Sequence, residues 1–133
     1  MKAVTRETYV ADFNKAFGHP VNVDMTKEEM ILRLDLICEE FDEFVEEVHL
    51  AYNALADGEP ITNKANLLKE LADLQYVVSG FAAVFGLPLS TAFNRVHYSN
   101  LSKLGLDGKP LKRGDGKILK GPNYQPCNLE DLV

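Results

Sequence analysis

Residues 26–57 read TKEEMILRLDLICEEFDEFVEEVHLAYNALAD and predict one uninterrupted helix. Thr26 and Glu29 have the spacing of a capping box, in which a hydroxyl and a carboxylate bond two otherwise free backbone amides. Apolar residues then recur at helical spacing until Asp57 and Gly58 end the pattern. A helix of this length extends about 45 Å, which is long for a chain of 133 residues.

Shorter helical patterns lie on either side of this segment. Residues 5–17 and 67–85 repeat apolar side chains every three or four positions, and each pattern ends at a glycine. A fourth helix is predicted over residues 90–104, with Ser90 as its N-cap. The rest of the chain is rich in glycine and proline, which indicates loops and one small hairpin at most. We therefore expect an all-α bundle of four main helices, in which the long acidic helix packs on the third.

Length and composition limit the class of protein. With 133 residues, a hydrophobic fraction of 46% and two cysteines, residues 1–133 fit a single domain that needs no disulfides. No apolar run approaches the roughly 20 residues that a bilayer span requires, and the first residues do not resemble a signal peptide. These features predict a soluble, cytoplasmic protein with no membrane partner.

Charge is distributed unevenly along the chain. Residues 1–94 carry seven basic and sixteen acidic side chains, whereas residues 95–133 carry seven basic and four acidic ones. The acidic body argues against a nucleic-acid partner, because affinity for nucleic acid comes largely from basic contacts to phosphates. The irregular basic tail from about residue 105 suits a small anionic ligand instead.

Six acids crowd into residues 39–47, and no basic residue separates them. Like charges three and four positions apart on a helix repel, so a solvated helix face normally alternates them with Lys or Arg. Helical geometry places Glu40, Glu43 and Glu47 on one face, with Glu39 beside them. Such a stack of oxygen ligands suits a hard cation.

A second pair of carboxylates, Glu70 and Asp73, lies three residues apart on the apolar third helix. Burying unpaired carboxylates is unfavourable unless a cation neutralises them. If the two helices form a hairpin, both sets of acids converge on one or two divalent ions, and all-oxygen ligation selects Mg²⁺ or Mn²⁺. The alternative interpretation is a solvated charge run beside a surface pair of acids.

Other interpretations stay open at this point. A ferritin-like di-iron bundle needs two Glu-x-x-His units, and the pattern supplies one, Glu46 with His49. A non-catalytic helical module, which oligomerises or binds a nucleotide without turnover, is the alternative from another class. The Arg-Gly-Asp triplet at residues 113–115 is interpreted as a turn. Neither Cys38 nor Cys127 is predicted to be a nucleophile.

The pattern Glu39-Glu40-x-x-Glu43 followed by Glu70-x-x-Asp73 resembles the EExxE…ExxD signature of the MazG-like all-α nucleoside triphosphate pyrophosphohydrolases. Residues 69–80, 96–103 and 115–120 are similar to the phosphoribosyl-ATP pyrophosphohydrolase-like branch, which includes MazG-like dUTPases. The resemblance implies Mg²⁺-dependent or Mn²⁺-dependent hydrolysis of a nucleoside triphosphate to monophosphate and pyrophosphate. The expected substrate is dUTP or a related pyrimidine, in house-cleaning of the nucleotide pool, and phosphoribosyl-ATP is the alternative.

The resemblance also implies roles for individual residues. The cation would be ligated by four carboxylates, those of Glu40, Glu43, Glu70 and Asp73. Glu39 and Glu40 would act in catalysis, with Glu39 holding a second ion or activating the attacking water. Substrate contacts are predicted downstream, at His97, Asn100, Lys103, Lys117, Lys120 and Tyr124. The apolar third helix further predicts a homodimer or homotetramer, because one short chain would not cover it.

Overall fold

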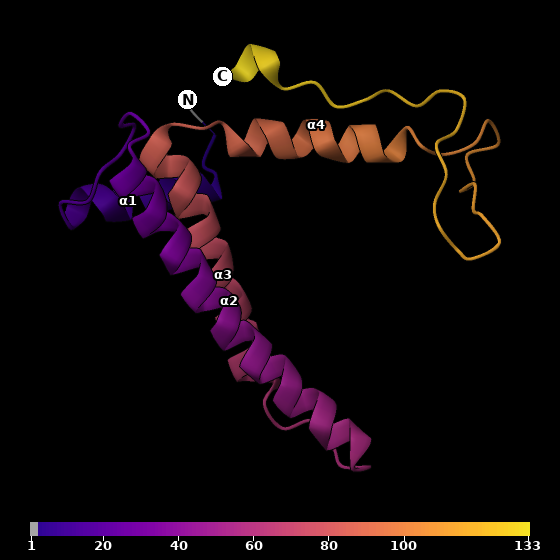
Figure 1. Ribbon diagram of the computed structural model, residues 1–133, viewed down its shortest axis with the longest axis horizontal. Helices are drawn as coiled ribbons and strands as arrows, with labels where there is room; N and C mark the ends of the chain where they lie inside the picture. Colours follow the sequence, from indigo (N-terminus) through magenta and orange to yellow (C-terminus); the bar gives the residue numbers. More distant parts are fainter. Residues whose placement is uncertain (1–2) are drawn as a thin grey trace. The chain divides into compact units, whose positions relative to one another are not determined.

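The computed structural model of the protein describes residues 3–133, and it is all-helical, as predicted. Within these residues the chain forms four α-helices, namely α1 (Arg6–Ala16), α2 (Lys27–Ala56), α3 (Lys64–Phe85) and α4 (Leu89–Leu101), followed by a short 3-10 turn (Glu130–Leu132). Figure 1 shows α2 and α3 running side by side. None of the helices in this part of the chain is, by itself, both long enough and apolar enough to cross a bilayer.

The chain divides into two compact units, Met1–Leu87 and Pro88–Val133. Helices α1 to α3 belong to the first unit, and α4 and the tail belong to the second. The uneven charge follows this division, since no charged residue lies between positions 88 and 94, so the first unit has a balance of −9 and the second +3. The expectation of a single domain over residues 1–133 stays a prediction.

The long helix α2 begins where the sequence predicts, after Thr26. The Thr26 hydroxyl accepts a hydrogen bond from the Glu29 backbone N–H at 3.2 Å. The Glu29 carboxylate bonds Arg33 Nε one turn further along, at 3.3 Å, instead of returning to the cap. A full capping box forms at α1, between Thr5 and Thr8. Sequence analysis overlooked this box because its second member is Thr rather than the usual Glu or Gln.

The core of the first unit lies where α1 covers the C-terminal half of α3. Val10 of α1 is buried there, together with Ser79 and residues 82–85 of α3. The segment after α1 closes this core, because the backbone N–H groups of Asn22 and Val23 donate to the carbonyls of residues 83 and 84. Carbonyls near a helix C-terminus have no partner within the helix, so this segment supplies one.

Helix α4 differs from its prediction at both ends. Pro88 occupies the N-cap position, so the assignment of Ser90 as N-cap is wrong. Pro restricts its own backbone angle, which favours a helix start directly after it. The helix ends at Leu101, earlier than predicted. There the Ser102 hydroxyl bonds the Ser99 carbonyl at 2.6 Å, and such local side-chain bonds compete with helical ones.

The tail folds back along α4 within the second unit. The Ser99 hydroxyl donates to the Gln125 carbonyl at 2.8 Å, and the Arg95 guanidinium bonds both oxygens of Asp131 at 2.6 and 2.9 Å. The expected small hairpin is present as one antiparallel bridge, between Lys112 and Ile118. The irregular tail is thus held by side-chain bonds rather than by regular secondary structure.

Candidate metal centre

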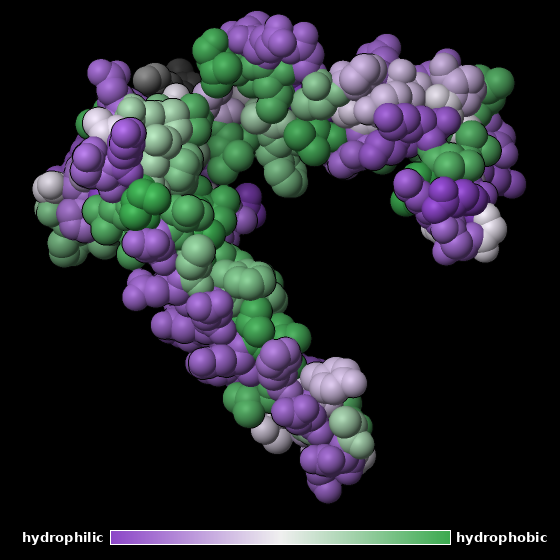
Figure 2. Space-filling view, in the orientation of Figure 1, coloured by the Kyte–Doolittle hydropathy of each residue, from purple (hydrophilic) through white to green (hydrophobic). Residues whose placement is uncertain are grey.

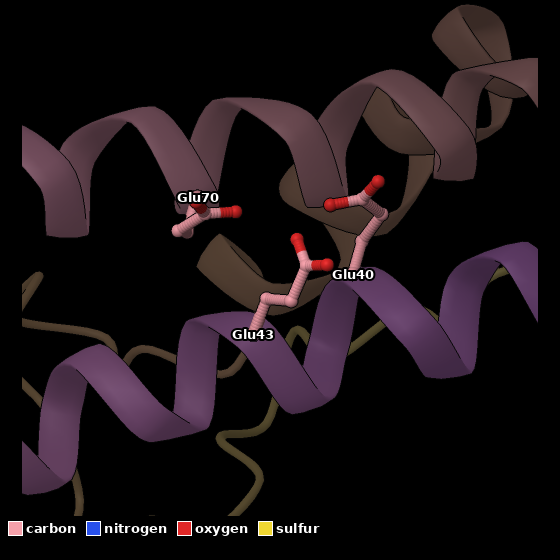
Figure 3. Close-up of side chains that lie close together, drawn as sticks. All are labelled: Glu40, Glu43 and Glu70. Carbon is pink, nitrogen blue, oxygen red and sulfur yellow. The ribbon is translucent and has the colours of Figure 1, made fainter.

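Three carboxylates meet between α2 and α3. Glu40 and Glu43 project from α2 and Glu70 projects from α3, and one oxygen of each lies within 4.8 Å of the others. Figure 3 shows the three side chains pointing toward one another across the space between the two helices. Glu40 and Glu43 share a face because they are three residues apart on one helix. The hairpin then brings the face of α3 that carries Glu70 opposite them.

Negative charge is crowded and partly buried at this point. Oε2 of Glu40 and Oε2 of Glu70 are both buried, and neither accepts a hydrogen bond from any group of residues 3–133. Burial raises the pKa of Glu40, and the neighbouring Glu43 carboxylate raises it further. Burial also raises the pKa of Glu70, and the adjacent Glu43 carboxyl group adds to that rise, whereas Lys69 opposes it. Both shifts follow from desolvation and like charge.

Asp73, the fourth predicted ligand, lies beside this cluster and pairs with a lysine. Lys69 Nζ bonds Asp73 Oδ2 at 2.7 Å and lies 3.7 Å from Glu70 Oε1. The hydrogen bond with Asp73 raises the pKa of Lys69, so the ammonium stays charged. The Asp73 charge still acts on the cluster, since it contributes to the raised pKa of Glu40. One lysine thus partly balances the acids of α3.

The three carboxylates fit a hard divalent cation. All the converging atoms are carboxylate oxygens, which are the ligands that Mg²⁺ and Mn²⁺ prefer. Buried polar atoms are normally bonded, yet one oxygen of Glu40 and one of Glu70 have no partner within the described part of the chain. A cation placed between Glu40, Glu43 and Glu70 would neutralise the crowded charge beside these oxygens.

Two other acids of α2 do not join the cluster. Glu39 is exposed and lies about 100° around the helix from Glu40. Glu47, which helical spacing places on the same face as Glu43, accepts hydrogen bonds from the amides of Asn63 and Asn66. On this face of α2, the carboxylates available to a cation therefore end at Glu43, because the side-chain amides of Asn63 and Asn66 bond Glu47.

A cleft of about 130 Å³, which the sequence analysis missed, opens between α1, α2 and α3. Phe13, His19, Arg33 and Tyr76 are among the residues that line it. The Phe13 ring lies edge-on to Tyr76 at 5.8 Å and to His19 at 6.0 Å. Leu36, which also lines the cleft, is one turn before Glu40 on α2.

The predicted substrate-binding residues all belong to the second unit. They lie on α4 or in the tail: His97, Asn100, Lys103, Lys117, Lys120 and Tyr124. Lys120 Nζ lies 4.7 Å from the centre of the Tyr124 ring, and the Lys103 carbonyl accepts a bond from the Gly121 N–H at 2.8 Å. Contact of these six residues with a substrate stays a prediction.

Comparison with known proteins places these residues in a wider context. The sequence profile of the phosphoribosyl-ATP pyrophosphohydrolase family matches residues 10–100, which run from α1 to α4. An uncharacterized protein of Acanthamoeba polyphaga mimivirus is 36% identical over 87 residues, which make up 60% of this chain and 30% of the viral protein. The chain therefore spans less than a third of the length of this relative.

Proposed function

Because the chain belongs to the phosphoribosyl-ATP pyrophosphohydrolase family, we propose that it hydrolyses the bond between the α- and β-phosphates of a nucleotide. The products are the nucleoside monophosphate and pyrophosphate. The observation that carries this proposal is the convergence of the Glu40, Glu43 and Glu70 carboxylates, in which Glu40 and Glu70 each have one buried oxygen without a hydrogen-bond partner in residues 3–133. The family supports a nucleotide pyrophosphohydrolase in general, and the cation and the substrate are the finer parts of the proposal.

The residues of α2 and α3 supply the charged groups of the reaction. Glu40, Glu43 and Glu70 would hold Mg²⁺ or Mn²⁺, with Asp73 beside them. Such a cation, when bound, neutralises phosphate oxygens and lowers the pKa of a bound water. Two packed helices fix the carboxylates before the substrate arrives, so little reorganisation is needed during the reaction. The sequence analysis predicts that Glu39 holds a second ion or activates the attacking water, and this role stays a prediction because Glu39 is exposed and points about 100° away from Glu40 around α2.

The aromatic cleft supports a substrate that carries a base. Phe13 and Tyr76 offer rings for stacking, and Arg33, whose Nε is bonded to Glu29, also lines the cleft. The matched family is named for phosphoribosyl-ATP as its substrate. We therefore rank phosphoribosyl-ATP above dUTP, which the sequence analysis expected first.

We further propose that the protein assembles from at least two copies in the cytoplasm. One face of α2 leaves large apolar side chains exposed at helical spacing: Ile31, Leu34, Phe41, Val48, Tyr52 and Leu55. Figure 2 shows apolar residues exposed along the α2–α3 hairpin beside its hydrophilic edge. Covering such a stripe with a second copy removes it from water. The sequence analysis based this expectation on α3, whereas the stripe that supports it lies mainly on α2.

A substrate panel tests the proposed reaction. The protein would be incubated with phosphoribosyl-ATP, dUTP and the common ribo- and deoxynucleoside triphosphates, each with Mg²⁺ and with a chelator. We expect pyrophosphate and a monophosphate from at least one substrate, and only with the cation. Release of orthophosphate, or hydrolysis that survives the chelator, would contradict the proposal. Turnover of no substrate would favour the non-catalytic module instead.

A further inference from the structure

We infer that Glu47, Asn63 and Asn66 form a clamp that sets the register of α2 against α3 and so positions the ligands Glu43 and Glu70. The inference rests on the proposed function, because it assigns these three residues to the geometry of the proposed metal centre. None of the three belongs to the predicted ligand set. They would act through the carboxylates and would not touch the cation or the substrate.

The clamp is built from three hydrogen bonds between distant parts of the chain. Asn63 Nδ2 donates to Glu47 Oε2 at 2.7 Å and to the Glu47 backbone carbonyl at 2.9 Å. Asn66 Nδ2 donates to the other carboxylate oxygen, Oε1. Each oxygen of Glu47 is thus held by a separate amide. Within residues 3–133, no other side chain of α2 bonds an amide or hydroxyl group of α3 or of its N-cap residue.

Asn63 makes this contact instead of its usual local one. It occupies the N-cap position of α3, where Asn is among the preferred residues because its side chain bonds a free backbone N–H. Here the Asn63 side chain makes no cap bond, since its amide is directed to Glu47 on the neighbouring helix. A local stabilising contact is therefore replaced by one between two helices. This exchange indicates that the alignment of α2 with α3 is the role of Asn63.

The clamp lies one helical turn from the proposed ligands on both helices. Glu43 is four residues before Glu47 on α2, and Glu70 is four residues after Asn66 on α3. Residues four apart lie on the same helix face, so the clamp and the carboxylates face the same groove. Fixing Glu47 against Asn66 therefore fixes Glu43 relative to Glu70. Metal ligands lose affinity when their positions shift by as little as about half an ångström.

Mn²⁺ binding by calorimetry, without nucleotide, tests the clamp. Glu47→Ala removes both carboxylate acceptors, and Asn66→Asp sets two like charges against each other. We expect each variant to weaken Mn²⁺ binding about tenfold, because the loss of a group that orients metal ligands commonly has an effect of this size. Helix content measured by circular dichroism should stay unchanged. The double variant Glu47→Gln with Asn66→Asp exchanges donor and acceptor, and we expect it to restore most of the affinity.

Two matched controls separate positioning from charge and from stability. Glu46→Ala removes an exposed carboxylate from the adjacent position of α2, and Ala51→Gly weakens the same helix at a buried position one turn beyond Glu47. We expect unchanged Mn²⁺ affinity in both, although Ala51→Gly lowers the melting temperature. Wild-type affinity in Glu47→Ala, or an equal loss in Ala51→Gly, would overturn the clamp alone. If the wild-type protein bound no Mn²⁺, the proposed metal centre and the clamp would both be wrong.

Discussion

Replacing Glu40 with Gln separates two effects of the carboxylate cluster on stability, which are the repulsion among the carboxylates and their binding of a cation. The substitution keeps the shape of the side chain and removes its negative charge. Without a divalent cation, we expect Glu40→Gln to be more stable than the wild type, because repulsion with Glu43 and Glu70 is relieved. With Mg²⁺ or Mn²⁺, the order should reverse, because the variant has lost a ligand.

The separation of the carboxylates sets the size of the effect. The carboxylate oxygens lie within 4.8 Å of one another, and at that separation two unit charges repel by about 1 kcal/mol in water and by about 3 kcal/mol at an effective dielectric constant near 20. We therefore expect the free energy of unfolding of the cation-free protein to rise by about 1–3 kcal/mol, and about 1 kcal/mol corresponds to roughly 4 °C in Tm. In contrast, a cation at about 1,000 times its Kd stabilises the wild type by about 4.1 kcal/mol, which exceeds the gain of the variant and so reverses the order.

The pH dependence has a definite sign. The pKa of Glu40 lies above its ordinary value of 4.5, so the folded chain binds this proton more tightly than the unfolded chain does. Protonated Glu40 therefore stabilises the fold below pH 4.5, and this contribution is lost as the pH rises through the raised pKa. The difference between Glu40→Gln and the wild type should be small at pH 4.5 and reach its full size at neutral pH.

Thermal melts followed by circular dichroism, with chelator and with Mn²⁺ at both pH values, measure these differences. Glu46→Gln is the matched control, because it removes an exposed carboxylate from the same helix. We expect its stability and its response to Mn²⁺ to match those of the wild type. Two results would refute this reasoning. One is a Glu40→Gln protein that is less stable than the wild type at neutral pH in the presence of chelator. The other is a variant whose melting temperature rises on addition of Mn²⁺ as much as that of the wild type.

The remaining predictions concern activity, the tail and assembly. Glu43→Gln and Asp73→Asn should each abolish turnover while circular dichroism shows the helices retained, and an active variant would remove that residue from the site. Gly121→Ala should expose the tail to proteolysis, because a Cβ there would clash with the Leu104 carbonyl oxygen; an unchanged digestion pattern would argue against this packing. Arg95→Ala should speed amide exchange in the last residues, which mass spectrometry would detect, whereas unaltered exchange would mean that its carboxylate pairing does not hold the tail. Light scattering should give at least twice the chain mass of 14.8 kDa, and a monomer at micromolar concentration would contradict assembly.

Local patterns made the helices and the carboxylate cluster predictable from the sequence. The cap at Thr26 and the recurring apolar residues of α2 depend only on near neighbours, so they can be recognised without the fold. The approach of Glu43 to Glu70 required one further assumption, that two apolar helices joined by a short turn pack as a hairpin. That assumption holds in the structure.

Contacts between distant segments could not be predicted in the same way. Nothing near Glu47 in the sequence indicates that Asn63 and Asn66 bind it, and Asn63 appears locally as an ordinary helix cap. The aromatic cleft combines side chains such as Phe13 and Tyr76 from separate helices, and aromatic residues at helical spacing are usually interpreted as core. The prediction failed at the start of α4, where Ser90 is a preferred N-cap residue type but Pro88, two residues earlier, occupies the N-cap position.

Pyrophosphate release, measured side by side for wild type, Glu70→Gln and Glu46→Gln with the best substrate of the panel, tests the central claim most directly. Each protein would be assayed with Mg²⁺ and with a chelator, and monophosphate, pyrophosphate and orthophosphate would be quantified separately. We expect equal amounts of monophosphate and pyrophosphate from the wild type and Glu46→Gln with Mg²⁺ only, and none from Glu70→Gln. Cation-dependent pyrophosphate release by Glu70→Gln at the wild-type rate would contradict the claim that the carboxylates between α2 and α3 form the active centre.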